Sequence, residues 1–300
     1  MLGASWRQRA RSILCPDTPR LEGQRALVTG GSEGIGLATS RGLLARGARV
    51  VMAARSAAKG EHAGSQLRGE LGEQLPLDFL PLDLSDLAQV DDAASRLATQ
   101  LGAERLDVLV CNAGLWPRRH SVSAQGHERA FATNVLGHFR LVRQLMGGLL
   151  ANDARVVIVT GDIYILTDDC TPDFAYRTPL GGMLAYCRSK LGDLWLAHEL
   201  QRRHPELKVR AVHPGVVATS LGGPRKGLAG AVSHQLLLDA DGGAQASLYC
   251  ATQPDLPKGA YVHNTHGIVK LPKGDPAADA ARAQHFWELC EALCESRLPA

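Results

Sequence analysis

The chain has 300 residues, and 45% of them are hydrophobic, which suits one large α/β domain and is too apolar for a disordered chain. The formal net charge of +3 arises in the first 20 residues, where four arginines accompany one aspartate, so that residues 21–300 are electrically balanced. This balance argues against nucleic acid as the main partner, and no apolar run approaches the roughly 20 residues that a transmembrane helix needs.

Residues 1–20 are interpreted as a basic N-terminal arm without the apolar core of a signal peptide. Residues 1–14 have the composition of a short amphipathic helix that makes weak peripheral contact with an acidic membrane, but a solvated arm is the preferred interpretation. The seven cysteines form no CxxC pair, which favours reduced thiols in a cytoplasmic protein and no metal site.

From residue 25 onward, apolar strands alternate with helical segments. Strands are expected at 25–30, 49–55, 77–84, 106–114, 208–215 and 259–264, with another in 156–165 that runs into a loop. Helices are expected at 34–47, 59–72, 87–102, 127–150, 184–203 and 279–295. Short buried strands between helices indicate a mainly parallel sheet with helices on both faces, a doubly wound Rossmann-type α/β fold, here over one domain at 21–300. The irregular segments 162–182 and 219–236 follow strands and should lie at the ligand-binding carboxyl edge.

The stretch "TGGSEGIG", Thr29 to Gly36, leaves a strand and opens a helix. Its glycines permit a tight turn and a close approach of phosphate to the backbone, and the helix N-terminus favours a pyrophosphate. The turn therefore predicts a dinucleotide site, in which the candidate contacts are Gly30, Ser32, Glu33, Gly34, Ile35 and Gly36.

The end of the next strand carries Arg55, with Lys59 one turn further on. Enzymes that bind NAD(H) usually place an acid there to accept from the ribose, whereas a cation suits the 2′-phosphate of NADP(H). NADP(H) is therefore the preferred cofactor over NAD(H), and the alternative is that Arg55 is a solvated surface arginine.

Two later strand ends should flank the same cofactor. Asp83, followed by Leu84, is a candidate acceptor for the adenine amine. Asn112, Ala113 and Gly114 are small enough for the cofactor to lie close.

The stretch "YCRSK" places Tyr186 and Lys190 at positions i and i+4 of a helix, on one face. A lysine charge beside the phenol favours the phenolate and is expected to lower the pKa of Tyr186 toward neutrality. Tyr186 is therefore a candidate acid/base for a carbonyl or an alcohol.

Together these motifs resemble the short-chain dehydrogenase/reductase superfamily over about residues 23–295. "AARSAAKGE", "NVLGHF", "HPGVV", "GGAQASLYCA" and "FWELCEAL" are similar to its retinol-dehydrogenase-like branch, which includes the WW-domain oxidoreductase relatives. The resemblance implies hydride transfer from or to a nicotinamide, with Tyr186 handling the proton and Lys190 holding the nicotinamide ribose. It also implies that Asn134 supports a proton-relay water. Pro214, Gly215 and Val217 are expected to contact the cofactor, and Thr219, which follows them, to contact its carboxamide.

The chain departs from the family's pattern at the end of "ARVVIVTG", residues 154–161. The family has Val-Ser-Ser there, and its second serine orients the substrate oxygen, but Gly161 takes that position here. Thr160 should point away from Tyr186 because side chains alternate along a strand, and Asp162 shares that parity unless the loop redirects it. Asp162, Thr160, Tyr164 or a water remain alternatives for the missing hydrogen bond.

The expected activity is therefore oxidoreduction of a small lipophilic carbonyl or alcohol. Retinoid-like or steroid-like substrates and a homo-oligomer follow only from the resemblance and the fold. Five side chains are candidates for the lining of an apolar substrate cleft, and ordinary loop packing is the alternative: Trp116, Ile163, Tyr164, Ile165 and Leu166. The competing hypothesis is an NADP(H)-binding protein with little turnover, which the missing hydroxyl at Gly161 favours.

Overall fold

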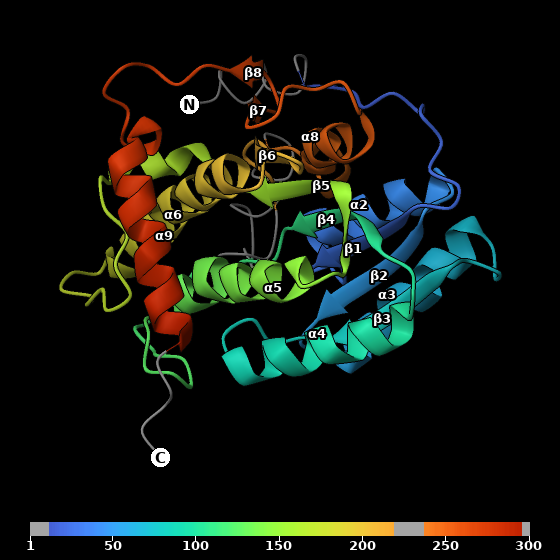
Figure 1. The fold of residues 1–300 in the computed structure, drawn as a ribbon, viewed down its shortest axis with the longest axis horizontal. Helices are drawn as coiled ribbons and strands as arrows, with labels where there is room; N and C mark the ends of the chain where they lie inside the picture. The colour runs from blue at the N-terminus through green and yellow to red at the C-terminus, as the bar shows by residue number, and fades with distance from the viewer. Residues whose placement is uncertain (1–11, 219–236, 296–300) are drawn as a thin grey trace, which may run out of the picture.

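The structure is a computed structural model that describes residues 12–218 and 237–295 (Figure 1). These residues build one eight-stranded sheet in the order β3-β2-β1-β4-β5-β6-β7-β8, in which β8 alone runs antiparallel to its neighbour. The strands are β1 (Arg25–Thr29), β2 (Arg49–Ala54), β3 (Leu77–Pro81), β4 (Leu106–Cys111), β5 (Leu150–Val159), β6 (Lys208–His213), β7 (Tyr261–His263) and β8 (Gly267–Val269). The predicted doubly wound, mainly parallel fold is confirmed.

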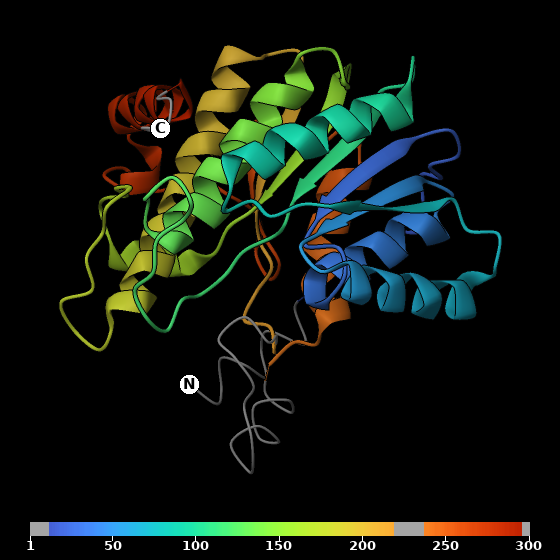
Figure 2. The same cartoon turned by 90° about the horizontal axis from the view of Figure 1, so that it is seen from below.

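The helices lie in two layers that cover the two faces of this sheet (Figure 2). Successive residues of β1 show why, because Leu27 packs into one hydrophobic core and Val28 into the other. The first core includes α4 (Leu87–Leu101), α5 (Gly137–Met146), α6 (Gly181–Arg203) and α9 (Ala280–Glu295). The second includes α2 (Gly34–Ala45), α3 (Ala57–Leu71) and α8 (Ala240–Thr252).

The segment 127–150 is not the single helix that its pattern suggested. It contains the π-helix η1 (Phe131–Leu136), then α5, and its last residue already belongs to β5. Gly148 adopts φ 118°, a left-handed conformation that turns the chain toward the strand. Two short 3₁₀ helices, η2 (Asp162–Leu166) and η4 (Pro276–Ala278), were also not expected from the sequence, nor was the edge strand β8.

The last residues of the basic arm pack against the body of the protein. Cys15 is buried, and its backbone N–H donates to the Gln245 side chain on α8. Arg46 donates to the carbonyl oxygen of Pro16 from the end of α2. Residues 1–11, most of the segment considered for membrane contact, lie outside the described residues, and none of the described helices is long and apolar enough to cross a bilayer.

Candidate active site

The glycine turn between β1 and α2 opens a cavity of about 400 Å³ at the carboxyl edge of the sheet. Gly30 and Gly34 have φ values of 64° and 56°, and a Cβ on Gly36 would lie 2.1 Å from the carbonyl oxygen of Gly30. The helix α2 begins at Gly34, and the side chain of its N-cap residue Glu33 does not cap it, so the first N–H groups of the helix face the turn without a side-chain acceptor. These features suit a bound pyrophosphate.

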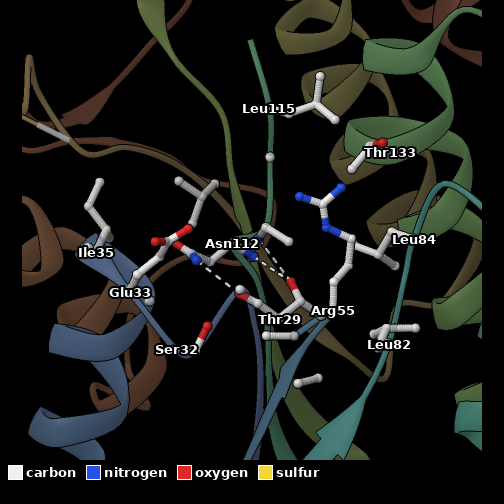
Figure 3. A pocket seen from close by; sticks show the side chains of 18 of the residues that line it. Thr29, Ser32, Glu33, Ile35, Arg55, Leu82, Leu84, Asn112, Leu115 and Thr133 are labelled. Carbon is white, nitrogen blue, oxygen red and sulfur yellow. Dashed lines mark hydrogen bonds between the residues drawn. The ribbon is translucent and has the colours of Figure 1, made fainter. Parts of the chain in front are cut away.

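Thr29 and Asn112 join the ends of β1 and β4 beneath this cavity (Figure 3). The Thr29 hydroxyl accepts from the backbone N–H groups of Asn112 and Ala113, both at 3.0 Å. The Asn112 side chain donates to the Thr29 carbonyl oxygen at 2.9 Å. Thr29 opens the glycine motif, but its role as a structural anchor was not predicted from the sequence.

Most residues that the sequence suggested for the cofactor line this one cavity. Those lining it are Gly30, Ser32, Glu33, Gly34, Ile35, Gly36, Arg55, Lys59, Asp83, Leu84, Asn112, Ala113, Gly114, Tyr186, Lys190 and Pro214. Gly215 and Val217 do not line it; Val217 instead pairs with Leu238 in an isolated β-bridge. Thr219 lies outside the described residues.

Charged side chains at the ends of β2 and β3 differ in how they are engaged. Lys59 donates to Glu33 at 2.9 Å, whereas Arg55 is exposed and has no hydrogen bond or ion pair among the described residues. Asp83 accepts from the N–H and hydroxyl groups of Ser85, at 2.9 and 2.7 Å, which fixes its carboxylate at the cavity wall. Figure 3 shows Glu33 and Arg55 on opposite sides of the cavity.

Tyr186 and Lys190 lie together on α6 and line the same cavity. The Lys190 Nζ is 5.5 Å from the centre of the Tyr186 ring and donates to the Val159 carbonyl oxygen at 2.9 Å. It also donates to Asp193 at 2.8 Å, and both partners are buried. Burial raises the pKa of Tyr186, and this effect together with Asp193 outweighs the lowering by Lys190. The expected shift toward neutrality is therefore wrong, because it ignored burial and the carboxylate beside the lysine.

Asn134 lies within the π-helix η1 and connects the loop after β4 to α6. Its side chain accepts from the Leu115 N–H at 2.8 Å and donates to the Ser189 hydroxyl at 2.8 Å. Its backbone carbonyl lies 2.7 Å from the His138 Nδ1, so a relay water at this oxygen would share it with the histidine. Asn134 thus holds fixed the backbone around Tyr186, whose own carbonyl oxygen accepts from Ser189.

Trp116 covers the tyrosine. Its ring stacks on that of Tyr186 with centroids 5.1 Å apart and planes at 2°. Of the other apolar cleft candidates, Ile165 and Leu166 are exposed. Tyr164 is buried and donates to Asp275 at 2.9 Å, so its hydroxyl is engaged away from Tyr186.

The two side chains that flank Gly161 after β5 are bonded to different parts of the protein. The Thr160 hydroxyl donates to the Lys190 carbonyl oxygen at 2.7 Å. Asp162 accepts from Tyr261 and, at 2.9 Å, from the Nε2 of His263, both on β7. Gly161 is buried, and among the described residues a Cβ on it would lie at ordinary contact distances, 3.8 Å from the Nδ1 of His213 and 4.0 Å from the Cγ of Lys190. The hydroxyl of the family's serine is therefore missing here, and the hydrogen bonds of Thr160 and Asp162 direct their side chains to other partners.

Asp162, His213 and His263 bring possible ligand atoms within 4.8 Å of one another. However, the Nδ1 of His213 accepts from the Asp162 N–H, and the Nδ1 of His263 accepts from the Thr265 N–H. Each ring then carries its proton on Nε2, the atom that faces the carboxylate, and offers no lone pair to a metal. Burial would raise the pKa of Asp162, but the hydrogen bond from His263, the electrostatic interaction with His213 and the hydrogen bond from Tyr261 lower it to about 2.

Comparison with known proteins agrees with this geometry. The family model of the short chain dehydrogenases matches residues 24–226. The chain belongs to the short-chain dehydrogenase family. Retinol dehydrogenase 14 of Mus musculus is 32% identical over 92% of this chain and 87% of its own, and the WW domain-containing oxidoreductase of Danio rerio is 33% identical over 90% and 68%.

Solved structures show the same fold. A protein from Mycobacterium paratuberculosis is 30% identical, with a TM-score of 0.74 over 96% of this chain and 100% of its own. A short chain dehydrogenase from Burkholderia cenocepacia, solved in complex with NADP, has a TM-score of 0.66 at 24% identity over 83% and 99%. As a short-chain dehydrogenase of the retinol-dehydrogenase-like branch, the protein is an oxidoreductase that uses a nicotinamide cofactor.

Proposed function

We propose that the protein is an NADP(H)-dependent oxidoreductase that transfers hydride between the nicotinamide and a small lipophilic carbonyl or alcohol. The observation that carries the proposal is the single cavity that joins the glycine turn and Arg55 to Tyr186 and Lys190. Nucleotide recognition and a proton-transfer group therefore share one space, as a hydride-transfer reaction requires. The names of the retinol dehydrogenase relatives support a retinoid-like or similar lipophilic substrate.

The choice of NADP(H) over NAD(H) rests on Arg55. A guanidinium without an ion partner among the described residues suits a 2′-phosphate, whereas Lys59 already pairs with Glu33. Both are exposed, so the Lys59–Glu33 pair is weak and Lys59 remains able to turn to a phosphate. The NADP complex of the Burkholderia cenocepacia relative is consistent with this choice.

When bound, the nicotinamide supplies or accepts the hydride, and the residues of the chain manage the proton. The raised pKa of Tyr186 keeps its phenol protonated at neutral pH, so it donates a proton to a carbonyl oxygen during reduction. Lys190 donates two of its three N–H groups to partners among residues 12–218 and 237–295, which leaves the third for the nicotinamide ribose. Trp116, stacked on Tyr186, forms an apolar wall for the substrate.

An NADPH oxidation assay over a panel of aldehydes and ketones tests the proposal. We expect wild-type turnover and, for Tyr186→Phe, a loss of at least about 10²-fold, because phenylalanine keeps the Trp116 stack but lacks the proton. NADPH affinity, measured by fluorescence, is the control and should stay unchanged. Undiminished turnover in a Tyr186→Phe variant would exclude this residue as the acid.

A second candidate, an NADP(H)-binding protein with little turnover, is favoured by the absence of a hydroxyl at Gly161. It predicts tight NADPH binding with no turnover on any substrate of the panel. In that case turnover gained in Gly161→Ser would show that the serine hydroxyl alone was missing.

A further inference from the structure

Lys190 is held by a carboxylate that the sequence motif does not include. Asp193 follows it by three residues on α6, and the Nζ–Oδ2 distance is 2.8 Å. Lys190 is 4% exposed and Asp193 2%, so water screens neither charge effectively. The carbonyl oxygen of Val159 accepts a second Nζ hydrogen bond at 2.9 Å, which places the ammonium between α6 and the end of β5.

Among the described residues, Lys190 is the one charged partner that hydrogen-bonds to the Asp193 carboxylate. Its Oδ1 is buried and has no hydrogen-bond partner among the described residues. Next to it, Gly192 packs closely against Val135, Cys170 and Phe286. Burying a charged carboxylate with one oxygen that accepts no hydrogen bond costs free energy unless an opposite charge compensates it, and Lys190 supplies that charge. The titratable groups that sense Asp193 or its lysine come from several elements: Tyr186 and Lys190 of α6, Cys111 of β4, Cys170 before α6, and His138 of α5.

We propose that Asp193 is a positioning residue of the active site, which holds the Lys190 ammonium beside Val159 and offsets its charge next to Tyr186. The Tyr186 ring lies 5.5 Å from the ammonium, so it senses both charges of the pair. Lysine alone would favour the phenolate, and the carboxylate opposes it. Asp193 therefore keeps Tyr186 a proton donor over a wider range of pH, which suits reduction of a carbonyl.

The substitution Asp193→Asn tests this inference because it removes the charge and leaves an amide oxygen for Lys190. The pKa of Tyr186 is read from the ultraviolet absorbance of phenolate, as the difference between each protein and the same protein carrying Tyr186→Phe. We expect the Tyr186 titration to move to lower pH by about one unit or more, because the substitution removes the carboxylate charge that repels the Tyr186 phenolate. The reductase activity should then decline from a correspondingly lower pH.

Glu199→Gln is the matched control. Glu199 is a buried carboxylate on the same helix, but it pairs with Arg202 and Arg203. It lies 13 residues beyond Tyr186, roughly 20 Å along the helix, so the titration should not move. An equal shift in this control, or an unchanged Tyr186 titration in a folded Asp193→Asn variant, would overturn the inference.

The double variant Lys190→Met/Asp193→Leu covers the case in which Asp193→Asn does not fold. Buried ion pairs are often replaced by apolar residues without loss of stability. If the two charges offset each other, the Tyr186 titration stays within about half a pH unit of wild type. A rise of more than about one unit would show that Lys190 dominates and that Asp193 does not offset it. The inference rests on the proposed acid role of Tyr186, but the absorbance titration needs no turnover. A shift without turnover would therefore contradict only the proposed function.

Discussion

Restoring a hydroxyl at Gly161 should accelerate the reaction. The backbone there is extended, with φ −174° and ψ 142°, so any residue adopts it without strain. A new Cβ would lie 3.8 Å from the Nδ1 of His213 and 4.0 Å from the Cγ of Lys190, ordinary contact distances that leave room for a serine. A preorganised donor to the substrate oxygen contributes on the order of 10²–10³ in rate, or about 3–4 kcal/mol. We expect Gly161→Ser to raise the kcat for carbonyl reduction toward this range.

Gly161→Ala is the control, because it adds the same Cβ without a hydroxyl. Both variants reduce the flexibility of the unfolded chain at this position. Their free energies of unfolding should therefore exceed that of wild type by similar amounts, about 0.4–1 kcal/mol. The assay is steady-state NADPH oxidation with the best substrate of the panel, together with NADPH affinity for all three proteins. If Gly161→Ser is no faster than Gly161→Ala, the hydroxyl is not what this site lacks.

Two further predictions concern the cofactor and acid stability. Arg55→Asp should reverse the preference for NADPH over NADH, as measured by the ratio of the two dissociation constants, and an unchanged ratio would remove Arg55 from 2′-phosphate binding. Burial lowers the pKa of His138 and of His213 from the ordinary histidine value of about 6.5 to about 4. Between these two pH values the unfolded chain therefore binds more protons than the folded protein. The free energy of unfolding in urea should therefore fall by about 2 kcal/mol per histidine from pH 7 to pH 5. His213→Asn should reduce that fall, and equal stability at both pH values in wild type would contradict the sign.

What the sequence predicted well was encoded locally. The glycine turn, the strand ends around it and the Tyr186–Lys190 pair each follow from neighbouring residues in a known period, and the structure brings them to one cavity. The π-helix η1 was missed because its residues have the same helical pattern as α5. The pKa of Tyr186 was misjudged because burial depends on the whole fold, although Asp193 at i+3 from Lys190 was visible in the sequence.

The orientation of Asp162 shows the same limit more sharply. Strand parity alone could not place it, since β5 ends at Val159 and the chain turns into η2. Its partners, Tyr261 and His263, come from a strand about 100 residues later, and no local pattern announces them.

The end of β5 explains why no neighbour has replaced the missing serine. The Thr160 hydroxyl donates to the Lys190 carbonyl oxygen, and the Asp162 carboxylate accepts from His263 of β7. Turning either side chain toward the site would leave a polar group without its hydrogen-bond partner. Gly161 is buried as well, and a Cβ there would make ordinary contacts with His213 and Lys190. Gly161→Ser should therefore add a hydroxyl while both existing hydrogen bonds remain, whereas a substitution that redirects Thr160 or Asp162 would lose one of them. For this reason the gain in rate is expected from Gly161→Ser and not from changes at its two neighbours.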